Sequence, residues 1–90
     1  MTFRIDRFVS EENAIVLRVC GRVEIECLNT INELIEEETA KLALDLSEVT
    51  IANRDAATFL AVCERKGIEL RNCPPFLRGW VDKEQGSITP

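Results

Sequence analysis

The amino-acid sequence predicts a small α/β domain, with helices packed on a mixed β-sheet and the element order β-β-α-β-α-β-α. Three observations lead to this prediction. Four short apolar segments have the alternating or β-branched pattern of strands. Three other segments repeat apolar residues at helical spacing. Helices that join successive strands favour parallel neighbours with right-handed crossovers, and an opening hairpin adds one antiparallel strand.

The first half of the chain contains two predicted strands and one helix. Residues 3–9 alternate in polarity, whereas residues 14–20 are β-branched and nearly continuous, as in a more central strand. The polar residues 10–13 join them into a hairpin, and Gly21 breaks the second run. The helix that follows ends near residues 38–39. Its apolar face comprises Cys27, Leu28, Ile31, Leu34 and Ile35.

The second half alternates strands and helices. Residues 41–46 form a short buried strand, and residues 56–66 form the body of a second helix, with Gly67 at the C-cap position. Residues 68–73 form another strand. Pro75 can then begin a final helix. The apolar residues of that helix are Phe76, Leu77, Trp80 and Val81.

Length and charge limit the possible functions. Ninety residues make a single domain, which we assign to residues 1–82, followed by a polar, flexible tail over residues 83–90. The net charge of −5 disfavours nucleic acid and anionic membranes, which both require cationic surface. No apolar run approaches the ~20 residues of a membrane span. The charged, alternating amino terminus is unlike a signal peptide, so we expect a cytoplasmic protein.

Few catalytic arrangements are available to this composition. The chain has no histidine and no tyrosine, which excludes Ser-His-Asp and Cys-His pairs. The glycines are isolated, so no phosphate-binding loop is present. The cysteines have no C-x-x-C spacing; we interpret them as small buried hydrophobic residues, although a pair that meets in the fold could be redox-active. They are Cys20, Cys27, Cys63 and Cys73. We expect no metal, no cofactor and no enzymatic activity.

Several carboxylates have structural interpretations. Asp45 lies on an apolar strand, where we expect it to cap a nearby turn. Glu24 and Glu26 precede the first helix and offset its dipole. The run of glutamates at residues 36–38 lies at the opposite end, which the dipole disfavours. This run is either a solvated face or a docking patch.

The start of the second helix is the candidate functional site. Asn53 is a good N-cap, because its side-chain oxygen can accept a hydrogen bond from the amide of Asp55 or Ala56. Arg54 is then the first helical residue. The Asp55 carboxylate meets free N–H groups and the positive dipole end, an interaction worth about 0.3–1 kcal/mol. Asp55 thus occupies the place that a bound phosphate would take, and capping alone explains these residues equally well.

The stretch LALDLSEVTIANRDAATFLAV, residues 42–62, resembles the core signature of the STAS domain, the fold of sulfate-transporter tails and anti-sigma-factor antagonists. The segment LDLSEVT matches the strand of that signature well. The element order, the later strand GIELRNC and the hairpin ending at Gly21 fit the family too. The resemblance covers about residues 3–81.

The resemblance implies a phosphorylation switch that this chain has altered. In antagonists of this family, a serine at this helix start is phosphorylated by a partner kinase, which is also the anti-sigma factor. Asn53 takes the place of the family Asp, Arg54 of the phosphorylated Ser, Asp55 of the following Ser or Thr, and Ala56 of the Gly. A guanidinium cannot accept the phosphoryl group in this way. Regulation is therefore lost or moved to another hydroxyl: Ser47, Thr50 or Thr58.

The resemblance favours a non-catalytic protein-interaction module in a bacterial regulatory pathway. Its partner would be an anti-sigma or kinase-like protein or a larger STAS complex, and a homodimer is an open alternative. The expected contact surface comprises Thr50, Asn53, Arg54, Asp55 and Thr58. The alternative function is binding of a small molecule, nucleotide or lipid beneath the final helix. An enzyme based on thiols or carboxylates is the least favoured class.

Overall fold

The structure is a computed structural model that describes residues 3–38 and 41–88, with side chains as far as Glu84. The described residues form the elements in the predicted order β-β-α-β-α-β-α, and the predicted fold class is confirmed. The elements are β1 (Phe3–Val9), β2 (Ile15–Val23), α1 (Ile25–Glu37), β3 (Leu42–Ala52), α2 (Arg54–Arg65), β4 (Glu69–Arg71) and α3 (Pro75–Ile88).

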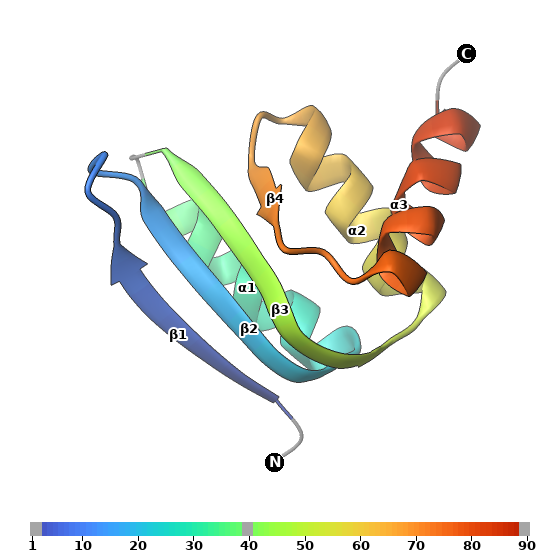
Figure 1. The fold of residues 1–90 in the computed structure, drawn as a ribbon, viewed down its shortest axis with the longest axis horizontal. Helices are drawn as coiled ribbons and strands as arrows, with labels where there is room; N and C mark the ends of the chain where they lie inside the picture. The colour runs from blue at the N-terminus through green and yellow to red at the C-terminus, as the bar shows by residue number, and fades with distance from the viewer. Residues whose placement is uncertain (1–2, 39–40, 89–90) are drawn as a thin grey trace.

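The strands pair in sequence order, β1-β2-β3-β4, into one mixed sheet (Figure 1). β1 runs antiparallel to β2, with Ile5 opposite Val19. β2 and β3 are parallel and place Leu17 opposite Leu44, and β3 is also parallel to β4. Parallel strands cannot be joined by a tight turn, so α1 and α2 serve as the crossover connections.

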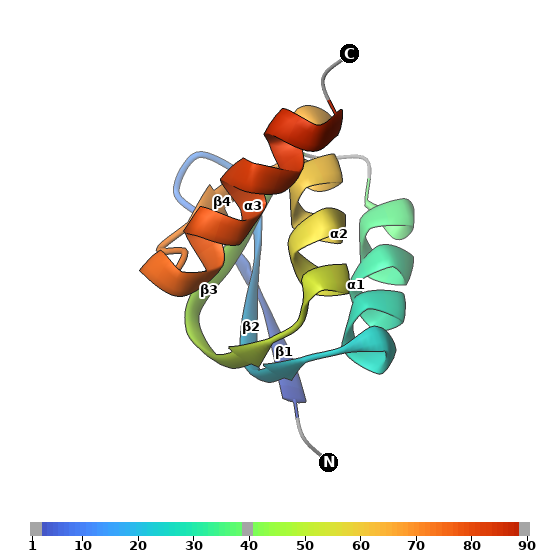
Figure 2. The same ribbon diagram turned by 90° about the vertical axis from the view of Figure 1, so that its right-hand side faces the viewer.

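Helices α1 and α2 cover one face of the sheet, and α3 packs beside α2 (Figures 1 and 2). Figure 2 shows α1 and α2 side by side in front of the strands, with both amino ends at the same end of the molecule. On α3, Arg78 donates to both carboxylate oxygens of Glu64 on α2, at 3.0 and 2.8 Å. These hydrogen bonds raise the pKa of the Arg78 guanidinium. This ion pair connects α3 to α2.

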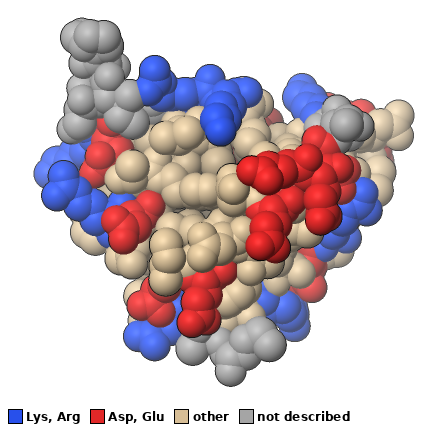
Figure 3. Space-filling view, turned by 180° about the vertical axis from the view of Figure 1, so that it is seen from behind, with Lys and Arg blue, Asp and Glu red and all other residues tan. Residues whose placement is uncertain are grey.

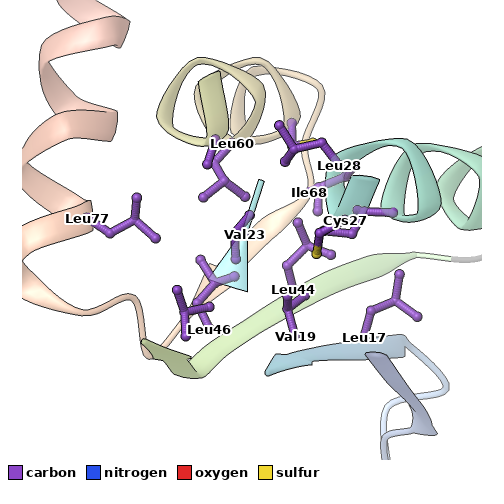
Figure 4. Packing of buried hydrophobic residues seen from close by; sticks show 14 of the residues in the cluster. Leu17, Val19, Val23, Cys27, Leu28, Leu44, Leu46, Leu60, Ile68 and Leu77 are labelled. Carbon is purple, nitrogen blue, oxygen red and sulfur yellow. The ribbon is translucent and has the colours of Figure 1, made fainter. Parts of the chain in front are cut away.

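The core lies between the sheet and this helical layer. Alternation along β2 and β3 directs Leu17, Val19, Leu44 and Leu46 toward the helices, and all four are fully buried. Leu60 of α2 is also fully buried, and Figure 4 shows these side chains converging between the two layers. Each buried Leu or Val contributes about 1.5–3 kcal/mol, which makes the alternating pattern the main determinant of which face the helices cover.

Strand β3 is longer than predicted, and this changes the setting of Thr50. The alternation predicted a strand over residues 41–46, whereas β3 continues to Ala52. The additional residues pair with β2 across two register shifts, one of them next to Gly21, whose φ is 91°. Val49 is buried in this extension. Thr50, which follows the predicted strand in the sequence, therefore lies on β3.

Strand β4 is shorter than predicted. The apolar pattern predicted a strand over residues 68–73, but β4 comprises only Glu69–Arg71. Asn72 has a φ of 54°, which is outside the strand region and takes the chain toward the helix start at Pro75.

Helix α3 corrects the prediction of a flexible tail over residues 83–90. The helix continues to Ile88, so the tail prediction is wrong as far as that residue, and residues 89–90 lie outside the described part. Val81 is fully buried and Glu84 forms an ion pair with Arg54, so contacts with the rest of the domain continue beyond the predicted helix end. No helix within residues 3–38 and 41–88 is long and apolar enough to cross a membrane.

The apolar residues of α3 divide between two surroundings. Leu77 and Val81 are fully buried against the core. Phe76 and Trp80 are 50% and 43% exposed. Phe76 and Trp80 therefore lie at the surface and are not packed into the core.

Candidate functional site

Asn53 caps helix α2, as predicted. Its backbone is extended, with φ −107° and ψ −178°, and its Oδ1 accepts the N–H of Ala56 at 2.9 Å. Its carbonyl accepts the N–H of Ala57 at 3.3 Å. Ala56 is buried, so water does not easily replace the side-chain cap. A cap of this kind contributes about 1 kcal/mol and fixes the direction of the first helical turn.

Asp55 is exposed in the first turn of α2, where the sequence placed it. The unpaired N–H groups and the positive end of the helix dipole stabilise a carboxylate there. The result is a negative side chain at the amino end of α2.

Arg54 forms an ion pair that the sequence did not predict. Its Nε donates to Oε1 of Glu84 on α3 at 3.1 Å. The Arg54 side chain is 83% exposed and that of Glu84 is 15% exposed, so the pair lies at the surface and contributes about 0.2–1 kcal/mol. Together with Trp80 and Lys83, the pair lines a surface hollow of about 490 Å³.

The hydroxyl groups proposed as alternative phosphorylation sites are all exposed. Thr58 lies one turn into α2, and its Oγ1 donates to the carbonyl of Arg54 at 3.1 Å. Thr50 lies on β3, three residues before Asn53. Ser47 lies further back on the same strand. The structure thus groups Thr58 with the cap residues on one helical turn and leaves Ser47 outside this group.

A groove between α1 and α2 adjoins the capped turn. We call it the α1–α2 groove; its volume is about 410 Å³. It is lined by Ile25, Leu28, Asn29 and Asn32 of α1 and by Asp55, Thr58 and Phe59 of α2. Asp55 and Thr58 therefore face a second element that the predicted contact surface did not include.

Sequence reasoning missed exposed apolar residues around the capped turn. Ile25 is 60% exposed at the start of α1, and Ile51 is 47% exposed at the end of β3. One signal was available for Ile25: it lies off the apolar face that Cys27, Leu28 and Ile31 define. Nothing in the sequence indicated that α3 would bring Glu84 to Arg54.

Comparisons with known proteins show a similarity to solved structures. No protein-family model matches the sequence, and no curated protein does. Among solved structures, the fold is similar to the crystal structure of an anti-sigma-factor antagonist STAS domain from Rhodobacter sphaeroides. The TM-score is 0.56 and the identity 18%, over 78% of this chain and 84% of that chain. The chain has a STAS-like fold.

The STAS-like fold confirms the resemblance seen in LDLSEVT at the level of architecture. An identity of 18% supports a conclusion about the fold but not about the function. What the site does must therefore be argued from its own residues. The chain places at the start of α2 a cap, a paired cation and an exposed carboxylate, in the order Asn53, Arg54, Asp55.

Three of the four cysteines of the STAS-like domain are poorly suited to nucleophilic chemistry. Cys27 and Cys63 are buried, and burial raises the pKa of each thiol to about 11. Burial also raises the pKa of Cys73. A thiol with a raised pKa forms little of the reactive thiolate at neutral pH. Among the described residues, no group of three or more His, Cys, Asp or Glu side chains could hold a metal ion.

Asp45 was predicted to cap a turn, and this prediction is wrong, because Asp45 and its partner Ser47 both lie on β3. Its Oδ1 accepts the backbone N–H of Ser47 at 3.0 Å. Burial alone raises the pKa of Asp45, but the hydrogen bonds from Ser47 oppose this effect. Asn72 and the charge of Arg18 act in the same direction as Ser47, and the pKa of Asp45 is below its usual value. A carboxylate held ionised in this way is a structural anion and a weak general base.

Proposed function

We propose that this chain is a non-catalytic protein-interaction module of a bacterial regulatory pathway of the anti-sigma-antagonist type. It acts in the cytoplasm. It binds its partner through the amino end of α2, and the partner is an anti-sigma or kinase-like protein or a larger STAS complex. The fold, similar to that of an anti-sigma-factor antagonist, supports this class of function.

The observation that carries the proposal is the composition of the exposed surface at the amino end of α2. Arg54 and Asp55 put opposite charges on adjacent exposed positions, and Ile25, which lines one groove with Asp55, adds exposed apolar area beside them. Charged residues around an apolar centre are typical of protein interfaces. They also select partners, because a partner with mismatched charges is repelled.

Regulation at this surface differs from a serine switch. Position 54 holds a guanidinium and cannot gain a phosphate there. Docking is therefore either constitutive or controlled at Thr50, Thr58 or Ser47, whose side chains are exposed. Phosphorylation of Thr58 would add about −1.5 to −2 charges next to Asp55 and disrupt docking by repulsion.

Site-specific photo-crosslinking in the native cell tests the proposal. A benzoylphenylalanine replaces Thr58 in the contact surface or, as a control, Glu12 in the β1–β2 turn. We expect a kinase-like ATPase or a larger STAS protein to crosslink from position 58 and not from position 12. Mass spectrometry of the product also identifies phosphorylation of Ser47 or Thr50, and mass spectrometry of the unsubstituted protein identifies phosphorylation of Thr58. The absence of such a product, or the same products from both positions, would refute the proposal.

Small-molecule binding is a second candidate, favoured by the hollow beside Arg54. Trp80, 43% exposed, lines this hollow together with Lys83 and Glu84. An indole next to cationic side chains is suited to a flat or anionic ligand. Titration with nucleotides or fatty acids, monitored by the fluorescence of the single tryptophan, tests this function. An unchanged spectrum at millimolar ligand would exclude binding in the hollow.

A further inference from the structure

The α1–α2 groove has an apolar centre, an uncharged wall on α1 and one acidic residue, Asp55, on α2. Leu28 and the half-buried Phe59 lie along it, and Ile25 is exposed at its amino end. Asn29 and Asn32 form its α1 wall. In Figure 3, which shows the helical face, uncharged surface lies beside a concentration of acidic side chains. An apolar groove between two helices is a surface on which a third amphipathic helix can pack.

The rim of the groove on α1 is acidic. Between Ile25 and Glu37 the sequence contains no lysine or arginine. Glu33 follows Asn29 by four residues, and Glu36 follows Asn32 by four, so each lies one turn along from a groove residue. The Asn32 amide donates to Oε1 of Glu36 at 3.2 Å, which places this carboxylate at the groove. The glutamates of α1 are Glu26, Glu33, Glu36 and Glu37, all exposed.

The stability of α1 does not explain this acidic rim. The carboxyl end of a helix favours cations, yet the last turn of α1 has no basic residue. Glu33 and Glu37 are also four residues apart and repel one another. In the part of the chain that the structure describes, neither Glu33, Glu36 nor Glu37 forms an ion pair with a basic side chain. A cationic partner would remove this repulsion on binding.

We propose that the α1–α2 groove binds a cationic amphipathic helix of the partner protein. The apolar side of the bound helix covers Ile25, Leu28 and Phe59, and its lysines or arginines face Glu33 and Glu36. This inference rests on the proposed function and specifies the chemistry of the partner. α2 has a basic residue, Arg65, in its last turn, so the cationic side of the bound helix faces α1.

Charge also argues against other occupants. An isologous dimer would bring two acidic rims together, because both subunits contribute the same surface. Nucleic acid and anionic lipid are repelled by the same glutamates. A basic protein segment is the occupant that matches both the apolar centre and the acidic rim.

A designed peptide tests the inference without knowledge of the native partner. The probe is a labelled helical peptide of about 14 residues, or four turns, with leucine at core spacing and lysine elsewhere. A second peptide replaces every lysine with glutamate, and a third carries a central proline that prevents helix formation. Fluorescence anisotropy with the full chain measures binding at low and physiological salt.

Matched variants separate the groove from the overall charge. The test variant is the double substitution Glu33→Lys and Glu36→Lys. The control, Glu48→Lys and Glu69→Lys, makes the same charge change on β3 and β4, at register positions opposite Cys20 and Ala43. A second comparison sets Ile25→Ser in the groove against Val9→Ser, since the two side chains are 60% and 61% exposed. Circular dichroism confirms that each variant is folded.

We expect the leucine–lysine peptide to bind, and the leucine–glutamate and proline peptides to bind at least about tenfold more weakly. The groove double variant should weaken binding about tenfold at low salt, with a smaller effect at high salt, and the control double variant less than about twofold. Ile25→Ser should weaken binding and Val9→Ser should not. If both double variants lost the same affinity for the peptide, the loss would depend on the net charge of the chain and not on the groove. This result would overturn the inference. The inference would also be overturned if sedimentation showed that the chain is a dimer and that the dimer forms through this groove.

The two proposals fail separately. If crosslinks from position 58 identify the expected partner but Glu33→Lys with Glu36→Lys leaves that complex intact, the groove inference is wrong and the proposed function stands. If the peptides and variants differ in affinity as expected but position 58 gives no crosslink, the groove binds cationic helices and the proposed regulatory function is refuted.

Discussion

Substitution of Asn53 by alanine tests whether the capped turn holds the candidate surface in place. Alanine cannot accept the Ala56 N–H that Oδ1 of Asn53 accepts at 2.9 Å. Ala56 is fully buried, so its donor is left without an easy replacement. Loss of an N-cap lowers the free energy of unfolding by about 0.5–2 kcal/mol. Because the donor of Ala56 is buried, we expect a loss in the upper part of this range, about 1–2 kcal/mol.

The assay is thermal unfolding followed by circular dichroism, with urea unfolding followed by Trp80 fluorescence. In a domain of this size, 1 kcal/mol shifts Tm by about 4–8 °C, so Asn53→Ala should lower Tm by roughly 4–16 °C. Asn53→Ser retains a capping oxygen and should lose only a few tenths of a kcal/mol. Asn32→Ala, an exposed asparagine in α1, is the matched control and should stay within about 0.5 kcal/mol of the parent.

Two results would refute the reasoning. If Asn53→Ala and Asn53→Ser were equally stable, the hydrogen bond to Ala56 would not matter for folding. If Asn32→Ala lost as much as Asn53→Ala, the effect would reflect the removal of any asparagine and not the cap.

Three further predictions follow from the core and the ion pairs. Leu60→Ala should destabilise the domain by about 2–5 kcal/mol, because Leu60 is fully buried; a urea-derived loss below 1 kcal/mol would contradict the packing. Asp45→Asn should lower stability at pH 7, and the difference from the parent should shrink as pH falls below about 4. The folded pKa of Asp45 is depressed, so its contribution is present above the unfolded pKa and is lost as the carboxylate is protonated in the fold; a pH-independent difference would contradict this. A double-mutant cycle of Arg54→Ala and Glu84→Ala should give a coupling of about 0.2–1 kcal/mol that decreases in high salt; zero coupling at low salt would show that the pair does not form.

Patterns that are local in the sequence were predicted well. The alternation of leucines predicted that β3 begins near residue 42, and the capping preference of asparagine predicted that α2 follows Asn53. Each of these features depends on residues within a few positions of one another, so short-range spacing was sufficient.

Features that depend on distant partners were predicted poorly. Beyond residue 46, β3 is held by pairing with β2, across bulges that no single segment encodes. The helical state of residues 83–88 went unpredicted because a polar composition favours a loose tail, whereas Val81 and Glu84 anchor the helix on the domain. A local pattern does not reveal which other element supplies such contacts.

The sequence alone determined the order of the elements, the buried face of β2 and of the first part of β3, and the identity of the charges at the start of α2. Period and capping are properties of neighbouring residues, and they are set before the chain is packed. Only the tertiary structure decided that Glu84 would meet Arg54 and that Ile25 and Asp55 would line one groove. These contacts join residues about 30 positions apart, as 54 and 84 are. They exist because the sheet places α1, α2 and α3 next to one another.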